Sequence, residues 1–189
     1  MEDQLTEEEK KILLRLARQS LIEAVRDRQL SPLDLNNLPE RLQMHGATFV
    51  TLTYRGALRG CIGALEPYLP LAEDVREHAR AAALEDYRFP PVQQGELGDI
   101  TIEISRLTIP QPLNYDGPVD LLEKLRSGID GVILQDGFHR ATFLPQVWEK
   151  LPDKATFLEH LCQKMGAQAD VWRRKKLQIY IYQVEEFHE

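Results

Sequence analysis

The residues best suited to chemistry lie in one short stretch, LRGCIGALEP, at positions 58–67. It places a cysteine between two glycines, with an arginine two positions before the cysteine. In an extended strand, side chains at positions i and i+2 share a face, so Arg59, Cys61 and Gly63 are expected on one side. A guanidinium beside a thiol favours the thiolate, which is the nucleophilic form of cysteine. The pattern therefore makes Cys61 a candidate nucleophile or acid.

Two other roles for Cys61 stay open, namely lining a binding pocket and packing in the core. Free cysteine is among the most buried residue types, and no histidine lies close to it in sequence to act as a base. Gly60 and Gly63 leave the backbone bare, so that a ligand or another chain segment can approach, while Ile62 faces the other way. Arg59 weighs against a dry core, because a buried arginine without a partner is costly.

The neighbours of Cys61 depend on the hairpin that contains it. The segment ATFVTLTYRGALRGCIGAL, residues 47–65, is rich in β-branched and aromatic residues and predicts two strands around a turn at 55–56. A two-residue turn there would pair Leu52 with Arg59 and Val50 with Cys61.

A second motif, EDYRFPPV, occupies positions 85–92. One interpretation places Asp86, Arg88 and Pro91 at the edge of a binding site, on a loop made stiff by prolines. The other is a helix end at which Arg88 pairs with Asp86 and stabilises the last carbonyls, while Phe89 anchors the loop in the core.

A third motif, HRATFLPQV, begins at His139. Gln146 follows a proline, and its amide either faces a ligand or bonds to loop backbone. His139 is expected on an exposed hairpin. The five histidines and two cysteines match no metal-site spacing, and the glycines match no nucleotide-binding fingerprint, so neither a metal nor a cofactor is expected.

The composition bounds the class of protein. The chain has 189 residues, a formal net charge of -7 and 43% hydrophobic residues, which is typical of one globular domain covering residues 1–189. The negative charge argues against a nucleic-acid or anionic-membrane binder, and the charged first residues and the lack of a long apolar run predict a cytoplasmic protein. Both cysteines are expected as free thiols, and the basic run 173–176 as a solvated connector.

Periodicity and capping signals predict the remaining elements. Thr6 and Glu9 form a capping-box pattern before a helical repeat of apolar residues. We expect helices at about 6–28, 71–84 and 119–126 and after Asp153, a strand from 100 to about 109, a hairpin over 131–144 around a turn at 136–137, and a last strand over 177–187. Helices and hairpins without regular alternation indicate an α+β fold, with mostly antiparallel sheet and flanking helices.

Taken in order, LRGCIG, DYRFPPV, TIEISRLT, GIDGVILQDGF and ATFLPQVW resemble the AMMECR-type domain family over most of the chain. The resemblance implies two lobes, a larger and a smaller subdomain, with a cleft between them lined by the glycine-rich motif. It also implies work with a Memo-type protein and a radical SAM protein, and it implies no agreed reaction. The candidate cleft residues are Arg59, Gly60, Cys61, Ile62, Gly63, Asp86, Arg88, Phe89, Pro91 and Gln146.

Two classes of function follow. In the first, favoured by the lack of a recognisable cluster of acid, base and nucleophile, the protein is a ligand-binding or assembly component that presents a small-molecule pocket or docking groove to those partners. In the second, it is an enzyme in which Arg59 holds a small anionic substrate and Cys61 acts as nucleophile or acid.

Overall fold

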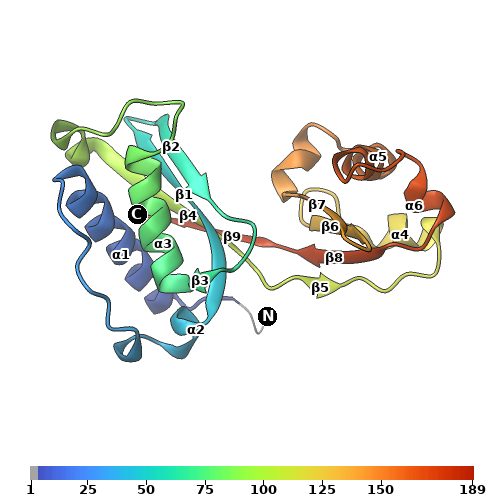
Figure 1. Cartoon of the computed structure of the whole chain (residues 1–189), viewed down its shortest axis with the longest axis horizontal. Helices are drawn as coiled ribbons and strands as arrows, with labels where there is room; N and C mark the ends of the chain where they lie inside the picture. The colour runs from blue at the N-terminus through green and yellow to red at the C-terminus, as the bar shows by residue number, and fades with distance from the viewer. Residues whose placement is uncertain (1–3) are drawn as a thin grey trace. The chain divides into compact units, whose positions relative to one another are not determined.

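A computed structural model of the chain describes residues 4–189, which divide into two compact units (Figure 1). Unit 1 runs up to Thr108 and includes Glu185–Glu189, and unit 2 is Ile109–Val184. Each unit has its own sheet and its own hydrophobic core. In the described part of the chain, no helix is both long and apolar enough to cross a membrane.

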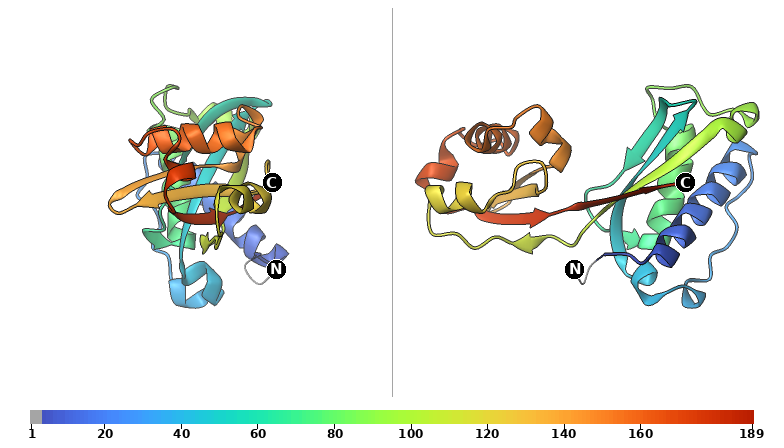
Figure 2. Two further views of the ribbon diagram at one scale, coloured as in Figure 1. Left: turned by 90° about the vertical axis from the view of Figure 1, so that its right-hand side faces the viewer. Right: turned by 180° about the vertical axis from the view of Figure 1, so that it is seen from behind.

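Unit 1 is an antiparallel sheet covered on one face by two long helices (Figures 1 and 2). The strand order is β2-β1-β4-β9, and β3 pairs with the start of β1. The strands are β1 (His45–Tyr54), β2 (Ala57–Gly63), β3 (Leu69–Pro70), β4 (Ile100–Leu107) and β9 (Val184–His188). The helices are α1 (Glu7–Val25), α2 (Glu40–Gln43) and α3 (Leu71–Leu84), with short 3-10 helices at Leu35–Asn37 and Gln94–Asp99.

The core of unit 1 lies between this sheet and helices α1 and α3. The period of two predicted for β4 is confirmed, since Ile100, Ile102 and Ile104 are buried and face the helices. Alternate residues of β1, Val50 and Leu52, are fully buried on the same face. The other face of the sheet therefore carries the intervening residues, which include Thr51 in β1 and its register partners in β2 and β4.

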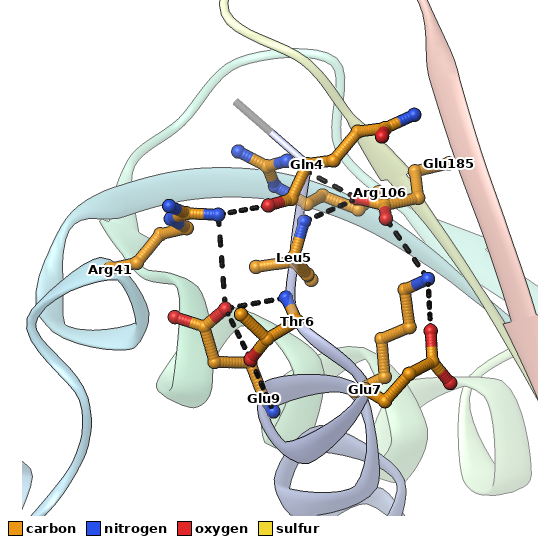
Figure 3. Close-up of polar contacts among 9 residues, drawn as sticks. Gln4, Leu5, Thr6, Glu7, Glu9, Arg41, Arg106 and Glu185 are labelled. Atoms are coloured by element: carbon orange, nitrogen blue, oxygen red, sulfur yellow. Dashed lines mark hydrogen bonds and ion pairs between the residues drawn. The ribbon is translucent and has the colours of Figure 1, made fainter. Parts of the chain in front are cut away.

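A polar network fixes the start of α1 against β9 (Figure 3). The predicted capping box is confirmed, because Thr6 and Glu9 bond reciprocally through side chain and backbone. Glu185 of β9 accepts a hydrogen bond from the backbone N–H of Leu5 and one from Arg106 of β4. Lys10 and Arg41 also form ion pairs here, with Glu185 and Glu9 respectively. The first turn of α1 is thus attached to strands far away in sequence.

Unit 2 has a four-stranded antiparallel sheet in the order β5-β8-β6-β7. Its strands are β5 (Gln111–Pro112), β6 (Gly131–Asp136), β7 (His139–Phe143) and β8 (Gln178–Tyr182), and its helices are α4 (Pro118–Lys124), α5 (Lys154–Lys164) and α6 (Val171–Arg174), with a 3-10 helix at Pro145–Glu149. In its core the Trp148 ring stacks on Phe157, with centroids 3.6 Å apart. As predicted, Asp153 caps α5, accepting from the backbone N–H of Thr156.

Several predicted boundaries differ from the structure, among them the end of β4 at Leu107 instead of about 109 and the end of α4 at Lys124 instead of 126. The expected strand 177–187 is two strands, β8 and β9, which belong to the sheets of different units. The alternation of apolar and polar residues continues from one strand into the next, because Ile179 and Phe187 are both buried. They lie in different cores, Ile179 in that of unit 2 and Phe187 in that of unit 1. The hairpin turn lies at Gly137 and Phe138 instead of 136–137, because Gly137 supplies the positive φ of 60° that the first turn position requires. Helix α1 ends at Val25, three residues early.

Candidate functional site

The hairpin that carries the RGCIG motif contains a β-bulge. The turn at Arg55 and Gly56 forms as predicted, with φ of 50° and 81°, and pairs Tyr54 with Ala57. The register then shifts, so that β2 continues one residue out of step with the ideal hairpin. An extra residue in one strand has this effect, and here it is Arg59.

The predicted pairs Leu52–Arg59 and Val50–Cys61 are therefore wrong. The structure pairs Leu52 with Gly60 and Thr51 with Cys61. Because a shift of one residue moves a side chain to the other face, Cys61 lies beside a threonine on the face away from the helices.

The two glycines of the motif leave room for the chain's own atoms. A Cβ atom on Gly60 would lie 2.1 Å from the carbonyl oxygen of Ala82, so β2 packs directly on the backbone of α3. A Cβ atom on Gly63 would lie 2.4 Å from the ring of Phe49. Of the two uses predicted for the bare backbone, the structure shows close approach by other chain segments.

Arg59 holds the loop after α3 against β2. Its guanidinium donates to Glu96 through Nε at 2.8 Å and Nη2 at 3.0 Å, and to the carbonyl oxygens of Pro90 at 2.8 Å and Pro91 at 3.3 Å. The Arg59 hydrogen bonds keep the pKa of Glu96 below its usual value and the pKa of Arg59 above its own. This guanidinium is therefore engaged by the loop.

Asp86 and Arg88 hold the backbone of Cys61. Asp86, only 4% exposed, accepts from the Cys61 N–H at 2.8 Å and is bound by Arg88 through Nε at 2.9 Å and Nη2 at 2.6 Å. Arg88 Nη2 also donates to the Cys61 carbonyl at 3.2 Å. The Arg88 side chain, and after it the backbone N–H of Cys61, hold the pKa of Asp86 far below its usual range. The interpretation in which Arg88 pairs with Asp86 is confirmed, but the carbonyl it stabilises is on β2.

These contacts cover the edge of the sheet at Cys61. β2 is the edge strand of its sheet, and the N–H and C=O of an edge strand are open to pairing with another chain. At Cys61 the carboxylate of Asp86 occupies the N–H, and the guanidinium of Arg88 occupies the C=O. We call the set Arg59, Cys61, Asp86, Arg88 and Glu96 the edge clamp.

The Cys61 side chain lies outside these backbone contacts. Thr51 Oγ1 donates to the Cys61 sulfur at 3.3 Å, and Glu103 of β4 is the register partner of Thr51 on its other side. All three residues are half-buried. In the described part of the chain, Thr51 is the one hydrogen-bond partner of the sulfur, so no base is in contact with the thiol.

The loop that the clamp holds exposes an aromatic residue. Tyr87 is 95% exposed, and Pro90 and Pro91 are exposed beside it. Phe89 is half-buried, with the Arg88 guanidinium 5.5 Å from its ring centroid. The expected core anchor is not Phe89, since Val92 fills that place at 3% exposure. A smaller apolar residue thus anchors the loop, and the aromatics stay near the surface.

Sequence reasoning missed Glu96 and Thr51. Glu96 accepts from the backbone N–H of Gln93 at 2.7 Å, so a glutamate three residues after this turn residue was a local signal for a fixed turn. No local signal identifies Thr51, because its place beside Cys61 depends on the bulge.

Nine of the ten candidate residues lie in unit 1, and Gln146 lies in unit 2, exposed on a 3-10 helix. His139 is exposed at the hairpin, as predicted. The second cysteine, Cys162, is fully buried in the core of unit 2, and burial raises the pKa of its thiol. Among residues 4–189 no group of three histidine, cysteine or acidic side chains is placed to hold a metal ion.

Comparison with known proteins assigns the chain to a family. The model of the AMMECR1 family matches residues 14–187. A protein of Methanothermobacter thermautotrophicus is 38% identical over 98% of this chain and 96% of its own length, and one of Methanococcus aeolicus is 42% identical over 82% and 79%. The crystal structure of an uncharacterized protein from Pyrococcus horikoshii superposes with a TM-score of 0.74 at 32% identity, covering 98% of this chain and 93% of the other.

Proposed function

The chain belongs to the AMMECR1 family, and we propose that it is a binding or assembly component that works with Memo-type and radical SAM partners. The proposal places the docking surface on the loop of residues 85–93 and on the adjoining part of β2. Both belong to the motifs that carry the family resemblance, and both are held in place by the edge clamp.

The observation that carries the proposal is that the two arginines of the motifs form ion pairs within the protein. Arg59 is bound by Glu96, and Arg88 by Asp86, so both guanidinium groups already have carboxylate partners. A guanidinium that already pairs with a carboxylate is less able to hold a small anionic substrate. In this clamp the charges instead fix the backbone of a surface loop, which is a structural use.

A rigid loop with an exposed aromatic side chain suits protein recognition. Tyrosine is enriched among the residues that dominate binding energy at protein interfaces. Docking through a loop that is already ordered avoids the entropy cost of fixing it on binding. Tyr87 fulfils both conditions, because the residues on either side of it, Asp86 and Arg88, bond to β2.

The test is co-purification of the protein with Memo-type and radical SAM proteins from one organism, using Tyr87→Ala. The matched control is Tyr68→Ala, which removes a tyrosine of unit 1 that is 73% exposed and lies outside the loop. We expect Tyr87→Ala to reduce retention of the partners about tenfold, which is the scale of one interface anchor, with an unchanged melting temperature. Equal retention by both variants, or no retention by the wild type, would overturn the proposal.

A second candidate function is an enzyme that uses Cys61 as nucleophile or acid. The observation that favours it is the hydrogen bond from Thr51 to the Cys61 sulfur. The measurement is the rate of iodoacetamide alkylation of Cys61 in the folded protein at neutral pH. A rate above that of a model thiol, lost in Thr51→Val, would favour the enzyme. A rate no faster than a model thiol would exclude an activated nucleophile.

A further inference from the structure

The outer side of helix α1 carries a groove that the edge clamp does not use. Its volume is about 800 Å³, and it extends along the helix from Glu8 to Ile22 and on to Arg28. At 1.5 Å per residue, the helical part is about 21 Å long. The groove is thus an open channel along four turns of helix.

The groove has an apolar floor. Leu14 and Ile22 line it, and both are half-buried, so part of each side chain reaches solvent. They lie eight residues apart on one side of the helix, which is about 12 Å. A second helix lying alongside presents a side chain about every turn. Two of its side chains, two turns apart, could therefore contact Leu14 and Ile22.

Three cations at the groove have no partner within residues 4–189. The side chains of Lys11 and Arg15, one turn apart, and of Arg28, beyond the helix end, form no hydrogen bond or ion pair there. The neighbouring cations differ, because Arg18 binds Glu189 and the carbonyls of Leu97 and Ile100. Lys10, Arg41 and Arg106 are likewise bonded in the network at the start of α1 (Figure 3).

Two of the carboxylates at the groove are occupied. Glu189 is bound by Arg18, and Glu23 accepts from Ser31 and Gln19, bonds that lower the pKa of Glu23 to about 2. Glu8, near the start of the helix, is the third carboxylate in the lining. Because the carboxylates of Glu23 and Glu189 are already bonded, the side chains of Lys11, Arg15 and Arg28 remain available to an outside anion.

We propose that the groove binds an amphipathic helix of a partner protein in which Asp and Glu residues flank an apolar stripe. The stripe would cover Leu14 and Ile22, and the acidic residues would meet Lys11, Arg15 and Arg28. A rod-like occupant fits a channel of this length, and its charge is complementary to the unpaired cations.

The experiment uses the full chain and three labelled synthetic peptides of about 16 residues, which gives about 24 Å of helix. One has leucines at helical spacing flanked by glutamates, one replaces the glutamates with lysines, and one replaces the leucines with alanines. Binding is followed by fluorescence anisotropy, and the site is mapped by backbone NMR shifts. The test variant is Lys11→Glu/Arg15→Glu/Arg28→Glu. The control is Lys150→Glu, a cation of unit 2 whose side chain also has no partner within the described residues.

We expect the acidic leucine peptide to bind at least tenfold more tightly than the other two, with shifts in α1. The triple variant should lose about tenfold in affinity without a change in melting temperature, while Lys150→Glu and Tyr87→Ala bind as the wild type does. Absence of binding, equal binding of the lysine peptide, or shifts confined to residues away from the groove would overturn the proposal. So would binding to anionic vesicles or self-association through the groove. Because Tyr87→Ala tests the docking loop and the triple variant tests the groove, each proposal can fail without the other.

Discussion

Each unit buries one aspartate against an arginine that stays half exposed, and the two pairs are used differently. Asp86 is 4% exposed beside Arg88, whose side chain is 45% exposed, and Asp130 is 0% exposed beside Arg126, at 50%. In both, the arginine donates twice to the carboxylate, and its own backbone N–H donates a third bond.

The difference lies in how far each carboxylate reaches along the chain. The Asp130 side chain bonds to Arg126, four residues away, and fixes the turn before β6. Asp86 also accepts from Cys61, 25 residues earlier, and joins a loop to the edge of a sheet. The same two residue types thus fix a local turn in one unit and a long-range contact in the other.

The largest expected effect comes from Asp86→Ala. It leaves the partly buried Cys61 N–H without its partner and removes the carboxylate that orients Arg88 beside β2, so we expect a loss of about 3 kcal/mol in the free energy of unfolding. Urea unfolding followed by circular dichroism measures it. The control is Asp99→Ala, which breaks the exposed pair with Arg55 and should cost less than about 1 kcal/mol. Equal losses in the two variants would show that the clamp adds nothing beyond a surface ion pair.

Asp130→Ala should cost less, about 1 to 2 kcal/mol. The Asp130 side chain bonds only to Arg126, whose guanidinium is half exposed to water, and its removal leaves no strand N–H without a partner. Hydrogen exchange separates the two variants by location. Asp130→Ala should speed exchange around residues 126–131, and Asp86→Ala should speed it in β2 and the loop 85–93. If Asp130→Ala changed exchange in β2 as well, the two clamps would not be independent.

The contrast also shows what the sequence could predict. Periodicity identified the Ile100, Ile102 and Ile104 strand, and local spacing suggested that Asp86 pairs with Arg88, because both signals lie within a few residues. The contact of Asp86 with Cys61 was not predictable, since it depends on the bulge at Arg59 and on how α3 packs on β2. An insertion of one residue into a pairing register leaves no mark in the hydrophobic pattern of so short a strand.

The charge of Asp86 gives the clamp a pH dependence. Because its folded pKa lies below the ordinary value of 3.8, the ionised carboxylate stabilises the fold fully above about pH 5. This stabilisation declines as pH falls below 3.8 and is lost as pH falls through the lower folded pKa. The difference in unfolding free energy between the wild type and Asp86→Asn should therefore shrink steadily below pH 4. Urea unfolding at pH 6, 4 and 3 measures it. A difference that is constant over this range would mean that the clamp does not depend on ionised Asp86.

The smallest expected effect is on thiol access, where each unit carries one free cysteine as a reporter. Cys162 is fully buried and burial raises its pKa, so it should be alkylated only when unit 2 opens. Cys61 is half-buried on the strand that the clamp holds, so Asp86→Ala should speed its alkylation about threefold by loosening β2. Asp130→Ala should leave Cys61 unchanged. Mass spectrometry of iodoacetamide adducts resolves the two sites, and equal acceleration at both in Asp86→Ala would mean that losing the clamp unfolds the whole chain instead of one edge.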